Sequence, residues 1–256
     1  MIFTIADKDL KALFASPLAW VVLTFVQLIL ALVFLRTLDN FMLIQPQLIQ
    51  VPNPPGITEL VVVPLFSATA VVLLFAVPLL AMRLIAEERR NQTMVLLVSA
   101  PLSMTEIALG KFFGLAVFLL LVIAIAVLMP LSLLLGGRLD FGLLASLIIG
   151  VVLLAACFAA VGLYASCLTA QPFVAAMIAF GLLLGMLLAG ETAAEGLHSR
   201  GWRVPAALAQ VLSPLKNYEP FAKGMLDSYA IACMLLLTVT FLILTIRRLD
   251  AVRLRG

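Results

Sequence analysis

Charged residues are scarce in this chain of 256 residues. They make up 11% of it, whereas hydrophobic residues make up 64%. A typical soluble domain is about 25% charged, so the composition excludes an ordinary soluble protein. Within the longest apolar runs, away from their ends, there is no Asp, Glu, Lys, Arg or His. Ion-coupled transporters usually keep such groups at membrane depth, and the sequence therefore offers no site for a coupling ion.

Cysteine and histidine are also rare, with three and one in the chain. Cys157 and Cys167 are ten residues apart on one expected helix, about 15 Å, which is too far for a disulfide bond. Cys233 belongs to another apolar run, and His198 stands alone in an expected loop. With neither a CxxC nor an HExxH pattern, the sequence predicts no metal site and no catalytic residues.

A nucleotide-binding loop is missing as well. The Walker A pattern, GxxxxGK[ST], needs a first Gly and a final Ser or Thr. Here Gly110-Lys111 is followed by Phe112, and Thr105 stands where the first Gly belongs. We therefore expect no cofactor bound by this chain, and an integral membrane enzyme is a disfavoured class. Energy for any work on a substrate would enter from another subunit.

Long apolar runs dominate what is present. A helix needs about 20 apolar residues to cross a bilayer, and a lipid-exposed backbone must satisfy its own hydrogen bonds. The sequence therefore predicts an all-α integral membrane protein, a single domain of residues 1–256 with six transmembrane helices. The expected spans are Pro17–Leu38, Leu60–Met82, Phe112–Leu135, Phe141–Thr169, Phe173–Ala189 and Tyr229–Ile246.

The basic residues predict the orientation. With six spans both termini share one side, and that side collects most Lys and Arg close to the span ends. These residues are Lys8, Lys11, Arg83, Arg89, Arg90, Lys111, Arg247, Arg248, Arg253 and Arg255. The positive-inside rule places both termini on the cytoplasmic side of the membrane. The net charge of +3 reflects this asymmetry and does not indicate a nucleic-acid partner.

The segment Arg83–Lys111 concentrates charge between two apolar runs. A helix is expected over Glu87–Val98, ending before Pro101, because the residue before Pro disfavours the helical region. Ser103-Met-Thr-Glu106 matches a capping box and predicts a second helix that runs through Lys111 into the third span. The pattern favours a surface that docks an aqueous partner. The alternative is a solvated connector whose charges only set the topology.

Two further segments flank the spans. Residues 1–16 place apolar and charged side chains on opposite faces, as in a short amphipathic helix lying in the interface. Residues 190–228 are polar and are expected to hold short outer helices, with Pro220 in a first helical turn; the alternative is an irregular loop. Small residues at a spacing of four indicate close helix packing, within the chain or at a dimer seam. They are Gly142, Ser146 and Gly150, and Gly181, Gly185 and Ala189.

The order of these features resembles a known family. An N-terminal helix ends in Ser16-Pro17, and a charged segment, IAEERRNQTMVLLVSAPLSMTEIALGKFFG, spans Ile85–Gly114. LSPLKNYEPFAKGMLDS, Leu212–Ser228, precedes the last span. Together they resemble the permease subunits of type-2 ABC (ABC-2) transporters. The branch that includes gliding-motility and nitrous-oxide-reductase-maturation permeases is the most similar.

The resemblance implies roles for each part. Residues 1–16 would be the elbow helix, 83–111 the cytoplasmic coupling helix region and 190–228 a periplasmic segment. The partners would be a dimer of ATP-binding subunits, which hold ATP and Mg, and a second permease copy in a homodimer or related heterodimer. The implied ATPase-docking residues are Glu87, Glu88, Arg89, Arg90, Thr93, Pro101, Ser103, Glu106 and Lys111. The conduit would lie between the two permeases, lined by Thr24, Gln27, Ser67 and Thr69.

The expected function is that of an ABC-2 permease subunit, which couples ATP hydrolysis by a separate subunit to export across the inner membrane. Membrane lipid surrounds such a protein. The alternative is a membrane transducer that transports nothing and passes the motion of the ATPase to a periplasmic partner. A polar stripe within a bundle also has a plain interpretation, as hydrogen bonding between helices.

Overall fold

The computed structural model describes residues 1–48, 55–93, 103–135, 139–190 and 211–253. These residues form helices and no strand, which confirms the all-α class. Short elements are η1 (Thr58–Val62, a π-helical turn), α4 (Ala86–Arg90) and η2 (Leu133–Leu135). The longer helices are α1 (Ile2–Ala15), α2 (Pro17–Leu48), α3 (Val63–Ala81), α6 (Met104–Ser132), α7 (Phe141–Leu168), α8 (Pro172–Leu188), α11 (Pro214–Ala222) and α12 (Ser228–Arg253).

Five helices are long and apolar enough to cross a membrane: α2, α3 with its flanking turns, α6, α7 and α12. The fifth expected span forms α8, which has 17 residues and is about 25 Å long. The hydrocarbon core of a bilayer is about 30 Å thick. The described residues therefore supply five full-length spans where the sequence predicts six. That α8 also crosses the membrane stays a prediction.

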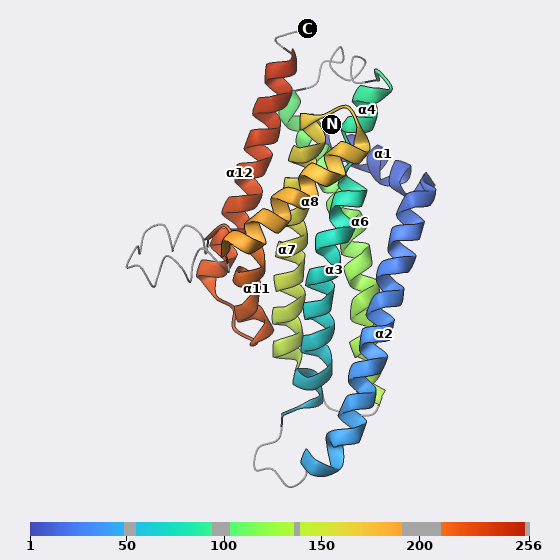
Figure 1. The fold of residues 1–256 in the computed structure, drawn as a ribbon, viewed down its shortest axis with the longest axis vertical. Coiled ribbons are helices and arrows are strands. Elements are labelled where there is room, and N and C mark those ends of the chain that lie inside the picture. The colour runs from blue at the N-terminus through green and yellow to red at the C-terminus, as the bar shows by residue number, and fades with distance from the viewer. Residues whose placement is uncertain (49–54, 94–102, 136–138, 191–210, 254–256) are drawn as a thin grey trace.

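Helix α7 lies at the centre of the bundle. It packs against α3, α6, α8, α11 and α12, and Figure 1 shows it upright between α12 and α3. Its interior position follows from its composition, since side chains on every face are apolar or small and most of them are buried. Helix α2 is longer than its expected span, with 32 residues, and its last turns are exposed.

The N-terminus, α4 and the C-terminal end of α12 lie at the same end of the bundle (Figure 1). This placement agrees with the prediction that both termini share one side with the charged segment. We call this the charged end. At the opposite end, α3 begins with the π-helical turn η1, and Thr58 Oγ1 accepts a hydrogen bond from the backbone N–H of Asp140 before α7, at 3.0 Å.

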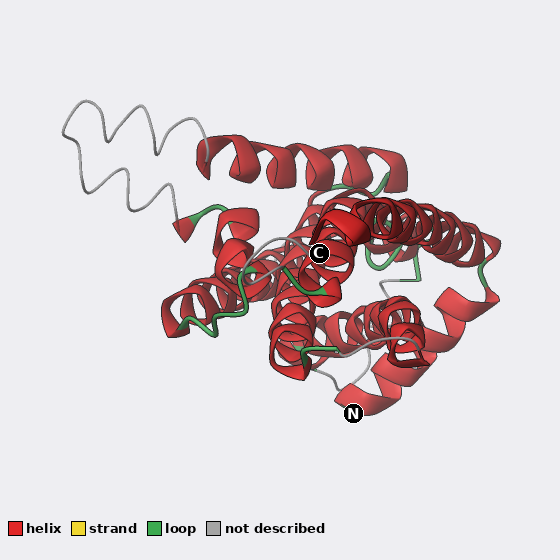
Figure 2. Cartoon of the chain, turned by 90° about the horizontal axis from the view of Figure 1, so that it is seen from below, coloured by secondary structure: helices red, strands yellow, loops and turns green. Residues whose placement is uncertain are grey.

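Helix α8 crosses the bundle obliquely instead of standing parallel to α7 (Figure 1). Seen from below, it runs lengthwise along one edge and leads to the grey trace (Figure 2). Its C-terminal end lies at the level of α11, not at the far end of the bundle. A Cβ added at Gly181 or Gly185 would meet no atom within 4 Å, so this pair leaves an open face on α8.

Helix α11 packs into the face of α7 that carries the first set of small residues. A Cβ at Gly150 would lie 2.7 Å from the Cβ of Phe221, and Ser146 Oγ donates to the Phe221 carbonyl at 3.1 Å. Ser146 and Gly150 therefore serve packing within the chain, whereas Gly142 is exposed. The helix begins at Pro214, so the expectation that Pro220 lies in a first turn is wrong. Residues 191–210 of the outer segment are outside the described residues.

Candidate functional site

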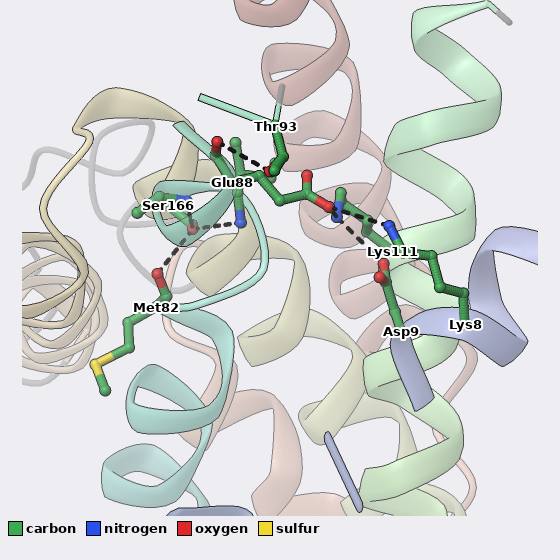
Figure 3. Close-up of polar contacts among 9 residues, drawn as sticks. Lys8, Asp9, Met82, Glu88, Thr93, Lys111 and Ser166 are labelled. Atoms are coloured by element: carbon green, nitrogen blue, oxygen red, sulfur yellow. Dashed lines mark hydrogen bonds and ion pairs between the residues drawn. The ribbon is translucent and has the colours of Figure 1, made fainter. Parts of the chain in front are cut away.

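The break between α3 and α4 is held by one side chain from α7. Ser166 Oγ donates to the Met82 carbonyl at 3.1 Å and accepts from the backbone N–H groups of Ile85, at 3.1 Å, and Ala86, at 3.0 Å (Figure 3). A helix start leaves N–H groups without intrahelical partners, and Ile85 has no side chain that could cap α4. Ser166, fully buried, supplies the missing acceptor from another helix.

Arg83 lies in this break and fixes the angle between α4 and the first two helices. Its guanidinium donates to both carboxylate oxygens of Glu87, at 2.7 and 2.9 Å. It also donates to Ser16 Oγ, at the junction between α1 and α2. A two-pronged pair of this kind is geometrically specific. Arg83 therefore joins the start of α4 to the point where the chain leaves α1.

The most buried charge of the site is Lys111, in the second turn of α6. Its side chain is 1% exposed, and its Nζ lies 3.2 Å from Asp9 Oδ2 and 2.8 Å from Glu88 Oε1. Lys8 Nζ approaches Glu88 Oε1 at 3.7 Å. Figure 3 shows these side chains converging from three segments. One buried ammonium thus connects α1, α4 and α6; the three residues Asp9, Glu88 and Lys111 are called the charge junction below.

Helix α1 can reach the charge junction because α6 begins with small residues. A Cβ at Gly110 would lie 2.7 Å from the Cβ of Ile5, and one at Gly114 would lie 3.1 Å from the Ala6 carbonyl oxygen. Any larger residue would push α1 away. The expected helix at residues 1–16 is present as α1, but its contact with α6 was not apparent from its own pattern. The sequence feature that could have predicted this contact is the pair of glycines, Gly110 and Gly114, on either side of Lys111.

The predicted capping box is confirmed. The backbone N–H of Glu106 donates to Ser103 Oγ at 3.2 Å, and the backbone N–H of Ser103 donates to Glu106 Oε2 at 3.1 Å. As expected, α6 then runs through Lys111 into a membrane-spanning stretch. The capping box determines where α6 starts, and therefore how far along the helix from its N-terminal end Lys111 lies.

The expected docking residues separate into three groups. Glu88 and Lys111 bind each other inside the charged end, and Glu87 binds Arg83 there. Arg90 and Thr93 are exposed, and Thr93 Oγ1 donates to the Glu88 carbonyl at 3.3 Å. The remaining residues have other positions: Arg89 has a buried Nε and Nη2 without a partner among the described residues, Ser103 and Glu106 form the capping box, and Pro101 lies outside the described residues.

The first helix of the charged segment is shorter than expected. A helix was expected over Glu87–Val98, but α4 ends at Arg90. Residues 91–93 form a turn in which Gln92 has φ +57°, a left-handed conformation that cannot continue a right-handed helix. Residues 94–98 of the expected helix are outside the described residues.

The four expected conduit residues occupy different surroundings. Thr24 is exposed on α2 and Ser67 is half-buried on α3. Thr69 is buried and donates to the Leu65 carbonyl of its own helix at 2.9 Å. Gln27 Nε2 donates at 2.8 Å to the Val122 carbonyl of α6 within the same chain. A conduit formed with a second copy stays a prediction.

Comparison with known families adds one finding. The family described as "ABC-2 family transporter protein" matches residues 3–252, nearly the whole chain. This range includes the charge junction, the break at Ser166 and the helices that hold them. A comparison with curated proteins found no match.

Proposed function

The chain belongs to the ABC-2 family of transporter proteins, and from this membership we propose that it couples ATP hydrolysis on a separate subunit to export across a bacterial inner membrane. It is a multi-pass transmembrane permease component and not itself an enzyme. Permeases of this family generally work with an ATP-binding subunit. That partner would hold ATP and Mg, because the sequence has no Walker A loop.

The observation that carries the proposal is the charge junction. Lys111 is buried between Asp9 of α1 and Glu88 of α4, so a displacement of α4 cannot leave the other two helices unmoved without separating a buried charge pair. Separating such a pair costs several kcal/mol. A force applied to the exposed part of the charged segment is therefore passed to α1 and to α6.

The docking surface that we propose consists of the exposed residues of the segment 83–111. Arg90 and Thr93 are exposed at the charged end, which the positive-inside rule assigns to the cytoplasm. Glu87, Glu88 and Lys111 hold this surface in place from behind. This division of roles refines the sequence-based set, in which all of these residues contact the ATPase.

A second copy of a permease, identical or related, would complete the transporter. The outward faces of α2 and α3 carry exposed apolar side chains, and Thr24 and Ser67 lie on these two helices. A conduit between two copies would be lined by such faces. The outer segment around α11 would cover the exit on the periplasmic side.

The test compares the chain alone with the chain and its ATP-binding partner. The purified chain should hydrolyse no ATP above background, whereas the two together in inside-out vesicles should hydrolyse ATP and concentrate a solute in the vesicle lumen. The lumen contents after incubation with cell extract are compared by mass spectrometry with and without ATP. Hydrolysis by the chain alone would contradict the proposal. Hydrolysis by the pair with no ATP-dependent solute would favour the transducer alternative.

A further inference from the structure

Two cavities follow one another along the same pair of helices. The first, about 280 Å³, lies between α1, the start of α2 and the break before α4, and its wall combines apolar residues with the charged side chains of Lys8, Asp9, Arg83, Glu87 and Glu88. The second, about 240 Å³, is purely apolar and lies between α2 and α3, with Val22, Val26, Ile29, Phe75 and Ala76 in its wall. We call them the polar cavity and the apolar groove.

The positions of the lining residues along α2 and α3 show that the polar cavity and the apolar groove adjoin, so that together they form one continuous path. On α2 the polar cavity ends at Ala19 and the apolar groove begins at Val21, less than one turn further. On α3 the corresponding residues are Leu80 and Leu79, which are neighbours in the chain. A single molecule with a polar head and an apolar tail would fill both without a gap.

The depth of the path matches one leaflet of a membrane. From Ala19 to Ile29 the helix rises about 15 Å, which is half of the roughly 30 Å hydrocarbon core. Trp20, 53% exposed, donates from Nε1 to the Phe14 carbonyl at 2.7 Å. Tryptophans of this kind sit at the level of the lipid headgroups. The polar cavity therefore lies at headgroup depth and the apolar groove among the acyl chains.

The charges in the wall select the headgroup. Lys8 and Arg83 are balanced by Glu87 and Glu88, and the buried Lys111 balances Asp9, so the wall has no excess charge of either sign. Lys8 is 65% exposed, and its nearest carboxylate oxygen is 3.7 Å away, beyond hydrogen-bond distance. Glu87, 35% exposed, can accept a further donor beside Arg83. The wall of this one cavity thus offers a cation, Lys8, and an acceptor, Glu87.

We propose that the polar cavity and the apolar groove bind one glycerophospholipid with a phosphoethanolamine headgroup. Lys8 binds the phosphate, the Glu87 carboxylate accepts from the primary ammonium, and one acyl chain lies in the groove between α2 and α3. A choline headgroup has no N–H to donate to Glu87, and a glycerol headgroup leaves a net negative charge in a neutral wall. The site does not depend on the proposed function, since it needs neither ATP nor a partner.

The test uses the purified full chain in detergent without any ATPase. It is titrated with dioleoyl phosphatidylethanolamine, phosphatidylcholine or phosphatidylglycerol, and native mass spectrometry counts the lipids bound to each chain. We expect one retained phosphatidylethanolamine, with affinity about tenfold above that of the other two lipids, the effect of one charged hydrogen bond.

Two pairs of variants locate the lipid. Lys8→Gln should weaken retention about tenfold, whereas Lys11→Gln should not, because Lys11 is paired with Asp7 and does not line the polar cavity. Ala76→Phe fills the apolar groove and should also weaken retention about tenfold, since a few displaced methylenes suffice. Val117→Phe, at an exposed position of α6, is the matched control. All four positions lie outside the charge junction. Because Ala76 is buried, the melting temperature of each variant is measured beside its lipid retention, and the Lys8→Gln and Lys11→Gln pair tests the site without any change in core packing.

Three results would overturn the proposal. The first is equal retention of phosphatidylethanolamine by the two cavity variants and their controls. The second is an equal or stronger preference for phosphatidylglycerol or phosphatidylcholine. The third is a dimer that carries no lipid and dissociates on Ala76→Phe, which would assign the apolar groove to a second copy of the chain.

Discussion

At the scale of single residues, the proposed transmission of force from α4 to α1 and α6 depends on the charge junction. Lys111 is almost completely buried, and its two carboxylate partners come from α1 and α4. A buried pair adds little stability compared with apolar residues of the same shape, but removal of one partner leaves the others as uncompensated buried charges. The junction should therefore behave as a unit in which single changes are costly and combined changes are mild.

The change Lys111→Met tests this behaviour. It leaves Asp9 and Glu88 buried without their cation, and we expect a loss of about 3–5 kcal/mol of stability, seen as a lower melting temperature of the purified chain. Lys11→Met, at an exposed pair with Asp7, should cost less than about 1 kcal/mol.

The combination of Lys111→Met with Asp9→Asn and Glu88→Gln supplies the control for charge. It removes all three charges together, so most of the lost melting temperature should return. If the combined variant melts as low as Lys111→Met alone, the cost comes from packing around the lysine stem and the electrostatic interpretation is wrong.

Interactions of the site between residues close together in the chain were predictable from the sequence, and those between residues far apart in the chain were not. The capping box of Ser103 and Glu106 was predictable because its partners are three residues apart and their types are specific. The pair of Asp9 and Lys111 joins residues 102 positions apart, and no local pattern announces it. The same holds for Ser166, which caps a helix start 80 residues earlier in the chain.

At the scale of elements, the apolar runs predicted the helices well, because hydrophobic length alone determines a membrane span. The starts of α2 and α7 match their expected spans, and α8 differs by one residue at each end. Tilt and depth were not predictable in the same way, since packing against neighbours sets them. The oblique path of α8 and the insertion of α11 beside α7 could not be predicted from composition.

The insertion of α11 can be tested at Gly150. A leucine there would collide with Phe221, whose Cβ lies 2.7 Å from the position of an added Cβ. We expect Gly150→Leu to cost about 1–3 kcal/mol through overpacking, measured as a lower melting temperature. Gly181→Leu, on the open face of α8, should be neutral or stabilising by up to about 1 kcal/mol, because leucine favours a helix over glycine. Equal destabilisation by both changes would show that α11 does not rest on α7 at this point.

At the scale of the whole molecule, the two ends of the bundle have different characters. The charged end holds α1, α4 and the C-terminal end of α12 (Figure 1), and its internal ion pairs join three helices. At the other end, a cavity of about 370 Å³ is lined by Glu59, Asp140 and Lys223, far from the charge junction. If an ATPase docks at the charged end, as proposed, its force would enter the bundle there. That docking place was inferred from the charge of the sequence and stays a prediction, whereas the pairing of Glu87 with Arg83 and of Glu88 with Lys111 is seen only in the structure.

The inward direction of those carboxylates decides which residue should be changed to test docking. Charge reversal at Glu87 or Glu88 would break the pairs with Arg83 and Lys111 and would disturb the fold together with any interface. Arg90 is exposed at the charged end, and Lys223 is exposed at the opposite end of the bundle. The two residues therefore form a matched pair of basic side chains, which the proposed topology assigns to different sides of the membrane.

The most direct test of the central claim is the amount of ATP-binding subunit that co-purifies with the chain at near-physiological salt. Arg90→Glu should lower it about tenfold, because one charged contact at a partly desolvated interface contributes about 1.5–3 kcal/mol. Lys223→Glu should leave it at the level of the unaltered chain. Normal co-purification with Arg90→Glu, or its loss with Lys223→Glu, would contradict the assignment of the charged end as the place where the ATPase docks.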